Sequence, residues 1–195
     1  MTRMTSMLLR LMLALTLSLG AASAALAGPI YRVAVDTAAL AGQGGYVDFL
    51  FLGLGSAAPT RAMLSGFAGD FGAASVFEGE AAGSLAGGVT LGNGTGWNEF
   101  AQAASFGGLF EFFVSFDAGT VGDGTNLGIA LLDQDFNYLG ANADIVTFAL
   151  QPGQADAISV NSGFATVQAV PEPGTALQVL TGLLLMGLVL RHGRR

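Results

Sequence analysis

The chain has 195 residues, a formal net charge of −7 and no cysteine, and its seven basic residues are all arginines. The absence of cysteine excludes a disulfide framework. The acidic balance excludes nucleic acid as a natural partner, because the surface would repel phosphate groups.

The first 27 residues have the three parts of a secretory signal peptide. Two arginines are followed by an apolar run over 11–19 and then by small residues. We expect the Sec translocon to export the chain and signal peptidase to cut between Ala27 and Gly28. A cut after Ala24 is the alternative, because small residues also precede that position.

Residues 28–170 have the length of one exported domain. This segment holds 13 carboxylates against two arginines, a net charge of −11, and it contains neither lysine nor histidine. Without His or Cys it cannot form a Ser-His-Asp or Cys-His catalytic site. It also cannot form a His- or Cys-ligated metal site. Carboxylates, hydroxyls and amides are the groups left for chemistry.

The hydrophobic pattern of this segment has a period of two, which predicts β-strands. In 30–36, for example, Tyr31, Val33 and Val35 fall on one face. Clusters of Gly, Asn, Asp and Pro separate the apolar stretches. We therefore expect an all-β fold, an antiparallel β-sandwich of the jelly-roll type. The expected strands are 30–36, 46–52, 109–117, 129–132, 145–150 and 165–169, and 97–105 is ambiguous between strand and helix.

Two pairs of glutamates are candidates for the carboxylate pair of a glycosidase. They are Glu78 with Glu80, and Glu99 with Glu111. Nothing in the sequence places either pair at the separation that this chemistry needs. Solvated surface carboxylates are therefore the favoured interpretation.

Four aromatic side chains are candidates for a platform that stacks on sugar rings. They are Trp97, Tyr46, Tyr138 and Phe113. Trp97 and Tyr138 are the predicted glycan contacts, with neighbouring amides such as Asn98 and Asn137 on the sugar hydroxyls. Packing of these rings in the core is the favoured interpretation, with the sugar platform as the alternative.

Oxygen-bearing side chains alternate in a short stretch after the strand expected at 129–132. They belong to Asp133, Asp135 and Asn137. Calcium loops use this spacing, because the ion needs several oxygen ligands. The stretch lacks the glycine and the distal glutamate of an EF-hand. It favours a polar turn between strands, with a calcium site as the alternative and no other cofactor expected.

The last 25 residues have three parts in a fixed order. The first is the motif Pro171, Glu172 and Pro173, which its prolines hold extended. The second is an uncharged stretch over 175–190, which predicts a transmembrane helix, with a buried core helix as the alternative. The third is a basic tail that favours a cytoplasmic carboxy terminus. Its arginines are Arg191, Arg194 and Arg195.

These three parts resemble the PEP-CTERM sorting signal of Gram-negative bacteria. The resemblance implies recognition by an exosortase, a membrane-embedded enzyme that cleaves near the motif and passes the protein to the cell surface or beyond. Gly174 departs from the Ser or Thr that many members have after the second proline. Segments 31–37, 46–49 and 131–135 also resemble a small group of PEP-CTERM proteins of similar length with no assigned activity.

The sequence therefore predicts three regions: a signal peptide over 1–27, an exported β domain over 28–170 and a sorting signal over 171–195. We expect an exported protein of the cell envelope, the outer surface or the extracellular polysaccharide matrix, in contact with the membrane only transiently. Its expected role is structural or adhesive, without catalysis. The alternatives are a carbohydrate-binding module and a carboxylate-dependent glycoside hydrolase.

Overall fold

The computed structural model describes residues 28–140, 142–171 and 182. Within it, Pro29–Val170 form one compact unit. The predicted signal peptide with Ala27, the helix expected over 175–190 apart from Gly182, and the rest of the sorting signal after Pro171 lie outside the described residues. No helix in the described part is long and apolar enough to cross a membrane. Pro171 is exposed and follows the last strand directly.

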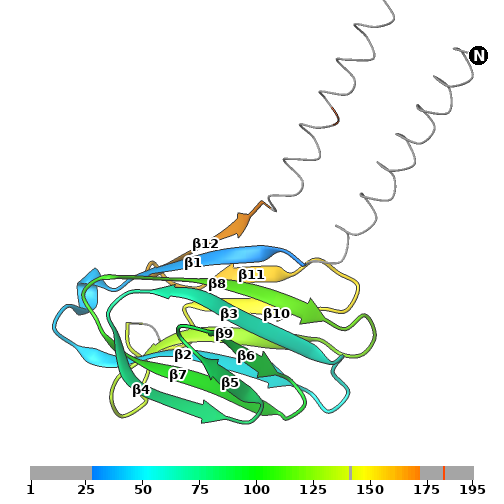
Figure 1. The fold of residues 1–195 in the computed structure, drawn as a ribbon, viewed down its shortest axis with the longest axis horizontal. Helices are drawn as coiled ribbons and strands as arrows, with labels where there is room; N and C mark the ends of the chain where they lie inside the picture. Colours follow the sequence, from blue (N-terminus) through cyan, green and yellow to red (C-terminus); the bar gives the residue numbers. More distant parts are fainter. Residues whose placement is uncertain (1–27, 141, 172–181, 183–195) are drawn as a thin grey trace, which may run out of the picture. The chain divides into compact units, whose positions relative to one another are not determined.

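Within the described residues, twelve strands form two six-stranded antiparallel sheets (Figure 1). This confirms the predicted all-β class. The first sheet has the order β12 (Ala165–Val170), β1 (Ile30–Asp36), β8 (Leu109–Ala118), β3 (Thr60–Ala68), β6 (Gly88–Gly92) and β5 (Ala81–Ser84). The second has the order β11 (Ala157–Val160), β10 (Val146–Leu150), β9 (Thr125–Leu132), β2 (Gly44–Gly53), β7 (Trp97–Ser105) and β4 (Phe71–Glu78). One 3-10 turn, η2 (Ala38–Leu40), connects β1 to β2.

Strands that are far apart in the sequence pair in a nested order. β1 pairs with β8, β2 with β7, and β3 with β6, and successive pairs alternate between the two sheets. β9 adds to the second sheet on the other side of β2. β2 therefore lies between β7 and β9, and its outward side chains are flanked by a strand on each side.

The two sheets face each other across a core that is rich in phenylalanine. On β2, alternate residues over 47–51 are fully buried. Phe49 on β2 meets Phe112 on β8 edge to face, with 4.9 Å between ring centroids. Phe148 on β10 lies 5.3 Å from Tyr31 on β1 by the same measure. Such pairs stabilise the packing beyond simple area burial. On β2, the residues between the buried ones, Asp48 and Leu50, point away from the core.

The predicted strands are all present, with ends shifted by a few residues. The ambiguous stretch 97–105 is a strand, β7, with neighbours on both sides. The structure adds β3, β4, β5, β6 and β11, which the sequence pattern does not show. β4, β5 and β11 lie at sheet edges and are mostly exposed, so no apolar alternation marks them. They are strands because a neighbouring strand pairs with them.

Candidate functional site

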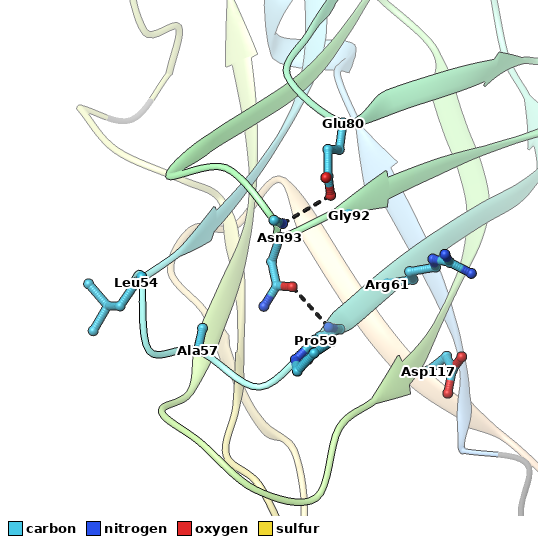
Figure 2. Close-up of a pocket in the computed structure, with 11 residues that line it drawn as sticks. Leu54, Ala57, Pro59, Arg61, Glu80, Gly92, Asn93 and Asp117 are labelled. Atoms are coloured by element: carbon cyan, nitrogen blue, oxygen red, sulfur yellow. Dashed lines mark hydrogen bonds between the residues drawn. The ribbon is translucent and has the colours of Figure 1, made fainter.

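Figure 2 shows a pocket beside the start of β3 and the end of β6, with several polar side chains in its lining. The buried Asn93 accepts a hydrogen bond from the backbone N–H of Thr60 at 2.9 Å and donates one to the carbonyl of Ala58 at 2.8 Å. The Glu80 carboxylate accepts a hydrogen bond from the backbone N–H of Gly94 at 3.0 Å. These polar groups hold loops together, and their partners lie within the protein.

A second pocket, of about 520 Å³, lies on the face of the second sheet that points away from the core. Three carboxylates and three aromatic side chains line it, with leucine and valine side chains between them. The carboxylates are those of Asp48, Glu78 and Glu99, and the rings are those of Trp97, Phe136 and Tyr138. We call it the acidic aromatic pocket.

Strand register brings the three carboxylates together from β2, β7 and β4. Glu99 on β7 lies opposite Leu50 on β2 and, on its other side, opposite Glu78 on β4. Asp48 is two residues from Leu50 and therefore shares its face, diagonal to Glu99. The alternation that buries Phe49 in the core turns Asp48 outward.

Small residues leave Asp48 in a recess of the sheet surface. The residues directly opposite it are Ala101 on β7 and Ala130 on β9. At Gly128, a Cβ atom would lie 2.2 Å from Oδ2 of Asp144, so the missing side chain leaves room for that carboxylate over β9. Asp48 is consequently only 7% exposed, although it lies on the outer face.

One oxygen of Asp48 lacks the donor that a buried carboxylate oxygen normally has. Its Oδ1 has no hydrogen-bond donor among the described residues. Burial, the negative charge of Glu99, a hydrogen bond with the Glu99 carboxyl group and the charge of Asp144 raise the pKa of Asp48 to about 8. A carboxyl group donates a hydrogen bond only when it is protonated. Asp48 therefore keeps its proton at neutral pH and can donate it in a hydrogen bond to Glu99.

The three rings surround these carboxylates and are open to solvent. Trp97, Tyr138 and Phe136 are 51%, 48% and 45% exposed. The indole Nε1 of Trp97 donates a hydrogen bond to Oε2 of Glu99 at 2.8 Å. Phe136 stacks on Tyr46, with 4.7 Å between ring centroids. Trp97 and Phe136 are thus held on one side and available for contact on the other.

The loop after β9 supplies two of the three rings. It begins with a turn in which Oδ1 of Asp133 accepts hydrogen bonds from the backbone N–H groups of Asn137 at 2.9 Å and Asp135 at 2.8 Å. The hydrogen bonds from the Asn137 backbone and side chain are the main reason that the pKa of Asp133 lies below its usual range. Tyr138 then returns to the sheet as the bridge partner of Leu132.

The predicted calcium ligands all lie in this turn. Both carboxylate oxygens of Asp133 accept hydrogen bonds from the side-chain amide of Asn137 or from nearby backbone. This is the arrangement expected of the favoured interpretation, a polar turn between strands. Within the described residues, no three His, Cys, Asp or Glu side chains are grouped in a way that would hold a metal ion.

The predicted aromatic platform is divided between two faces. Trp97 and Tyr138, the predicted glycan contacts, line the same pocket. Tyr46 lies on the same face of the second sheet, stacked on Phe136. Phe113 lies on β8 in the first sheet, where it packs beside Gly66, so it cannot join the other three rings.

The predicted glutamate pairs do not form a common site. Glu80 holds the loop shown in Figure 2, whereas Glu78 lines the acidic aromatic pocket. Glu111 forms an ion pair with Arg32 on the first sheet, whereas Glu99 lies on the second. The structure instead places Glu78 directly opposite Glu99 across β4 and β7.

Sequence reasoning missed Asp48 as a site residue. In the sequence it is a polar residue on the solvent side of an alternating strand, which is the commonest place for an aspartate. Its burial depends on residues of β7, β9 and the loop after β9. The one local signal is that Asp48 is the only charged residue of β2.

Comparison of the chain with family models, with curated proteins and with solved structures finds no match.

Proposed function

We propose that this chain is an exported, surface-sorted protein whose β domain binds extracellular polysaccharide in the acidic aromatic pocket, in a structural or adhesive role without catalysis. The observation that carries the proposal is the presence of three half-exposed rings and three carboxylates in one open pocket. Flat rings stack on the apolar faces of sugars, and carboxylates accept hydrogen bonds from sugar hydroxyls.

The fold supports this reading. The nested pairing of β1 with β8, β2 with β7 and β3 with β6 supports the jelly-roll type as the finer description of the fold. Lectin domains are among the proteins built on that architecture, although a fold by itself does not determine a function. The residues of the pocket, rather than the fold, carry the proposal.

A glycoside hydrolase is the second candidate, because a carboxyl group that holds a proton at neutral pH is what a general acid requires. The geometry favours binding instead. Retaining glycosidases keep their two carboxyl groups about 5 Å apart and inverting ones further, so that sugar or water fits between them. Asp48 and Glu99 are close enough to share a hydrogen bond, which leaves no room for the scissile bond between these two carboxyl groups.

The amino-terminal and carboxy-terminal signals complete the proposal. A signal peptide over 1–27 and a PEP-CTERM-type signal over 171–195 would carry the domain out of the cytoplasm and hand it to an exosortase. The net charge of −11 over 28–170 suits a soluble domain at the cell surface.

A glycan array with the purified full-length chain tests the binding proposal. We expect binding to a subset of polysaccharides and a loss of about tenfold or more with Trp97→Ala, because stacking on an exposed ring contributes about 1–3 kcal/mol by analogy with other ring stacking. Phe113→Ala is the matched control, since it removes a ring from the other sheet. Release of reducing ends from the bound polysaccharide would show catalysis instead.

A blank array, or equal loss of binding with Trp97→Ala and Phe113→Ala at unchanged melting temperatures, would contradict the binding proposal.

A further inference from the structure

The two sheets end in open edges on opposite sides of the sandwich. β11 and β12 are the outermost strands on one side, and β4 and β5 are the outermost strands on the other (Figure 1). No strand among the described residues pairs with the outer edge of any of these four. An edge strand presents a row of unpaired backbone N–H and C=O groups, and natural edge strands usually carry charges, prolines or bulges that prevent further pairing.

The side formed by β4 and β5 carries such protection. The register of β4 against β7 shifts between Phe71 and Ser75, which bends the edge, and the strand ends in a charged residue, Glu78. In β5, Gly83 has a φ of 131°, so the backbone is not extended there. A further strand would not find a regular edge on this side.

The side formed by β11 and β12 has none of this protection. Both strands pair with their inner neighbours without a register shift, and neither contains a charged residue or a proline. Asp156, immediately before β11, accepts a hydrogen bond from the hydroxyl of Tyr31 at 2.8 Å, so its carboxylate is directed back to the domain. We call β11 and β12 together the uncharged edge, an unusual surface in a segment with a net charge of −11 over 28–170.

Apolar side chains that face the interior are left open at the uncharged edge. Ile158 and Val160 on β11 lie opposite two fully buried residues of β10, so they face the core side of the second sheet. They are nevertheless 36% and 46% exposed, because no described residue covers the rest of their surface. A partner that added strands at this edge would bury them.

We infer that the uncharged edge pairs with the same edge of a second copy of this chain, as an isologous dimer. A two-fold axis perpendicular to the sheets would place β11 antiparallel to the partner's β11 and β12 antiparallel to the partner's β12 at the same time. Each sheet would continue into the equivalent sheet of the second copy, and Ile158 and Val160 would join one continuous core. The inference does not depend on glycan binding in the acidic aromatic pocket.

Charge identifies a second copy as the occupant of this edge. A basic partner would be selected by carboxylates in the contact surface, and the uncharged edge has none in its strands. Two copies of a domain with a net charge of −11 repel each other, so they can make a stable contact only where the surface carries no charge.

The size of the edge sets the expected strength of the dimer. It offers the four residues of β11 and the six residues of β12, fewer than the roughly 20–30 residues per side of a standard interface. We therefore expect a dissociation constant on the order of micromolar rather than nanomolar.

Sedimentation equilibrium of the full-length chain over a range of micromolar concentrations tests the inference. We expect a monomer–dimer equilibrium that shifts toward dimer when the salt concentration rises from about 0.01 M to about 0.15 M. The Debye length then falls from about 30 Å to about 8 Å, which screens the repulsion between the two acidic copies. A contact between opposite charges would weaken instead.

Matched variants locate the contact. Val160→Glu should weaken the dimer about tenfold or more, because it brings a carboxylate into the contact with a second acidic copy. Val121→Glu makes the same change in the loop between β8 and β9, where Val121 is 82% exposed, and should leave the dimer unchanged. Melting temperatures of both variants check that they are folded.

The absence of cysteine allows the contact to be mapped by cross-linking. Ser159→Cys places a single thiol in β11, close to the same strand of the second copy. A short bismaleimide should join two such chains at concentrations at which Val121→Cys gives no covalent dimer. Addition of Val160→Glu to Ser159→Cys should abolish the cross-link.

Three outcomes would contradict the inference. The first is a chain that stays monomeric at about 100 μM. The second is a dimer that Val160→Glu leaves intact, because its contact would then lie elsewhere. The third is growth into longer assemblies with rising concentration, which indicates head-to-tail pairing of opposite sides instead of a closed two-fold contact. The glycan-binding proposal is tested separately on the array and stands or falls independently of all three.

Discussion

A single aspartate accounts for most of the unusual chemistry of this domain. Asp48 is a residue of an alternating strand, yet two alanines opposite it and the carboxylates around it make its environment that of a buried acid. Its pKa of about 8 lies above the ordinary value of 3.8. The folded protein therefore binds a proton that the unfolded chain has already released between these pH values.

The sign of this linkage gives a prediction about stability. The contribution of Asp48 to the free energy of unfolding is fully present below about pH 4. It is lost as the pH rises toward 8, by at most about 1.4 kcal/mol per pH unit. Asp48→Asn keeps a neutral donor toward Glu99 at every pH. We expect the variant to unfold at a higher temperature than wild type at pH 8 and to lose this advantage near pH 5.

Thermal unfolding at four pH values between 5 and 8 measures this difference, with Asp117→Asn as the control for net charge. If the melting temperatures of wild type and Asp48→Asn changed with pH in the same way, the pKa of Asp48 in the folded protein would lie at its ordinary value, and the prediction would be wrong.

At the scale of an element, the turn after β9 decides where two of the three rings lie. Asp133 holds this turn by accepting hydrogen bonds from the backbone of Asp135 and Asn137. The next residues place Phe136 on Tyr46 and Tyr138 against Leu132. Phe136 has a φ of 63°, in the left-handed region that a bulky residue rarely adopts, so the surrounding contacts must hold it there.

Replacement of Asp133 should therefore loosen the pocket rather than the core. We expect Asp133→Ala to lower the melting temperature at pH 7 and to weaken binding of the array glycan. Because the pKa of Asp133 is lowered in the folded state, its stabilisation is present above the unfolded pKa and is lost as the pH falls through the folded pKa. The difference from wild type should thus disappear in strong acid.

A calcium titration of the same two proteins tests the alternative reading of this turn. If calcium raises the melting temperature of wild type but not of Asp133→Ala, the turn is a calcium site and not only a polar turn.

At the scale of the whole molecule, the proposed sorting route predicts two cuts. Mass spectrometry of the protein recovered from the cell surface should find Gly28 as its first residue and an end near Pro171. An intact carboxy terminus in an exosortase-containing host would contradict the sorting proposal. Pro171 is exposed just after β12, which leaves the start of the motif accessible to a processing enzyme.

The sequence predicted the parts of the fold that have strong alternation. β1 and β8 show this clearly, because every second residue is a large apolar side chain that enters the core. β4 and β5 could not be found, since their conformation comes from pairing with β7 and β6. At the candidate site, Trp97 and Tyr138 could be named as exposed aromatic candidates. Asp48 could not, because its burial is a property of neighbours distant in the sequence.

The recess around Asp48 has a consequence for the order of events in folding. The strands of the second sheet can pair while Asp48 is still hydrated, because its side chain points away from the core. We expect its carboxylate to lose the last of its water late in folding, when Tyr138 and Asp144 pack beside it. An alkaline solution should then shorten the lifetime of the native state more than it changes the rate at which the native state forms.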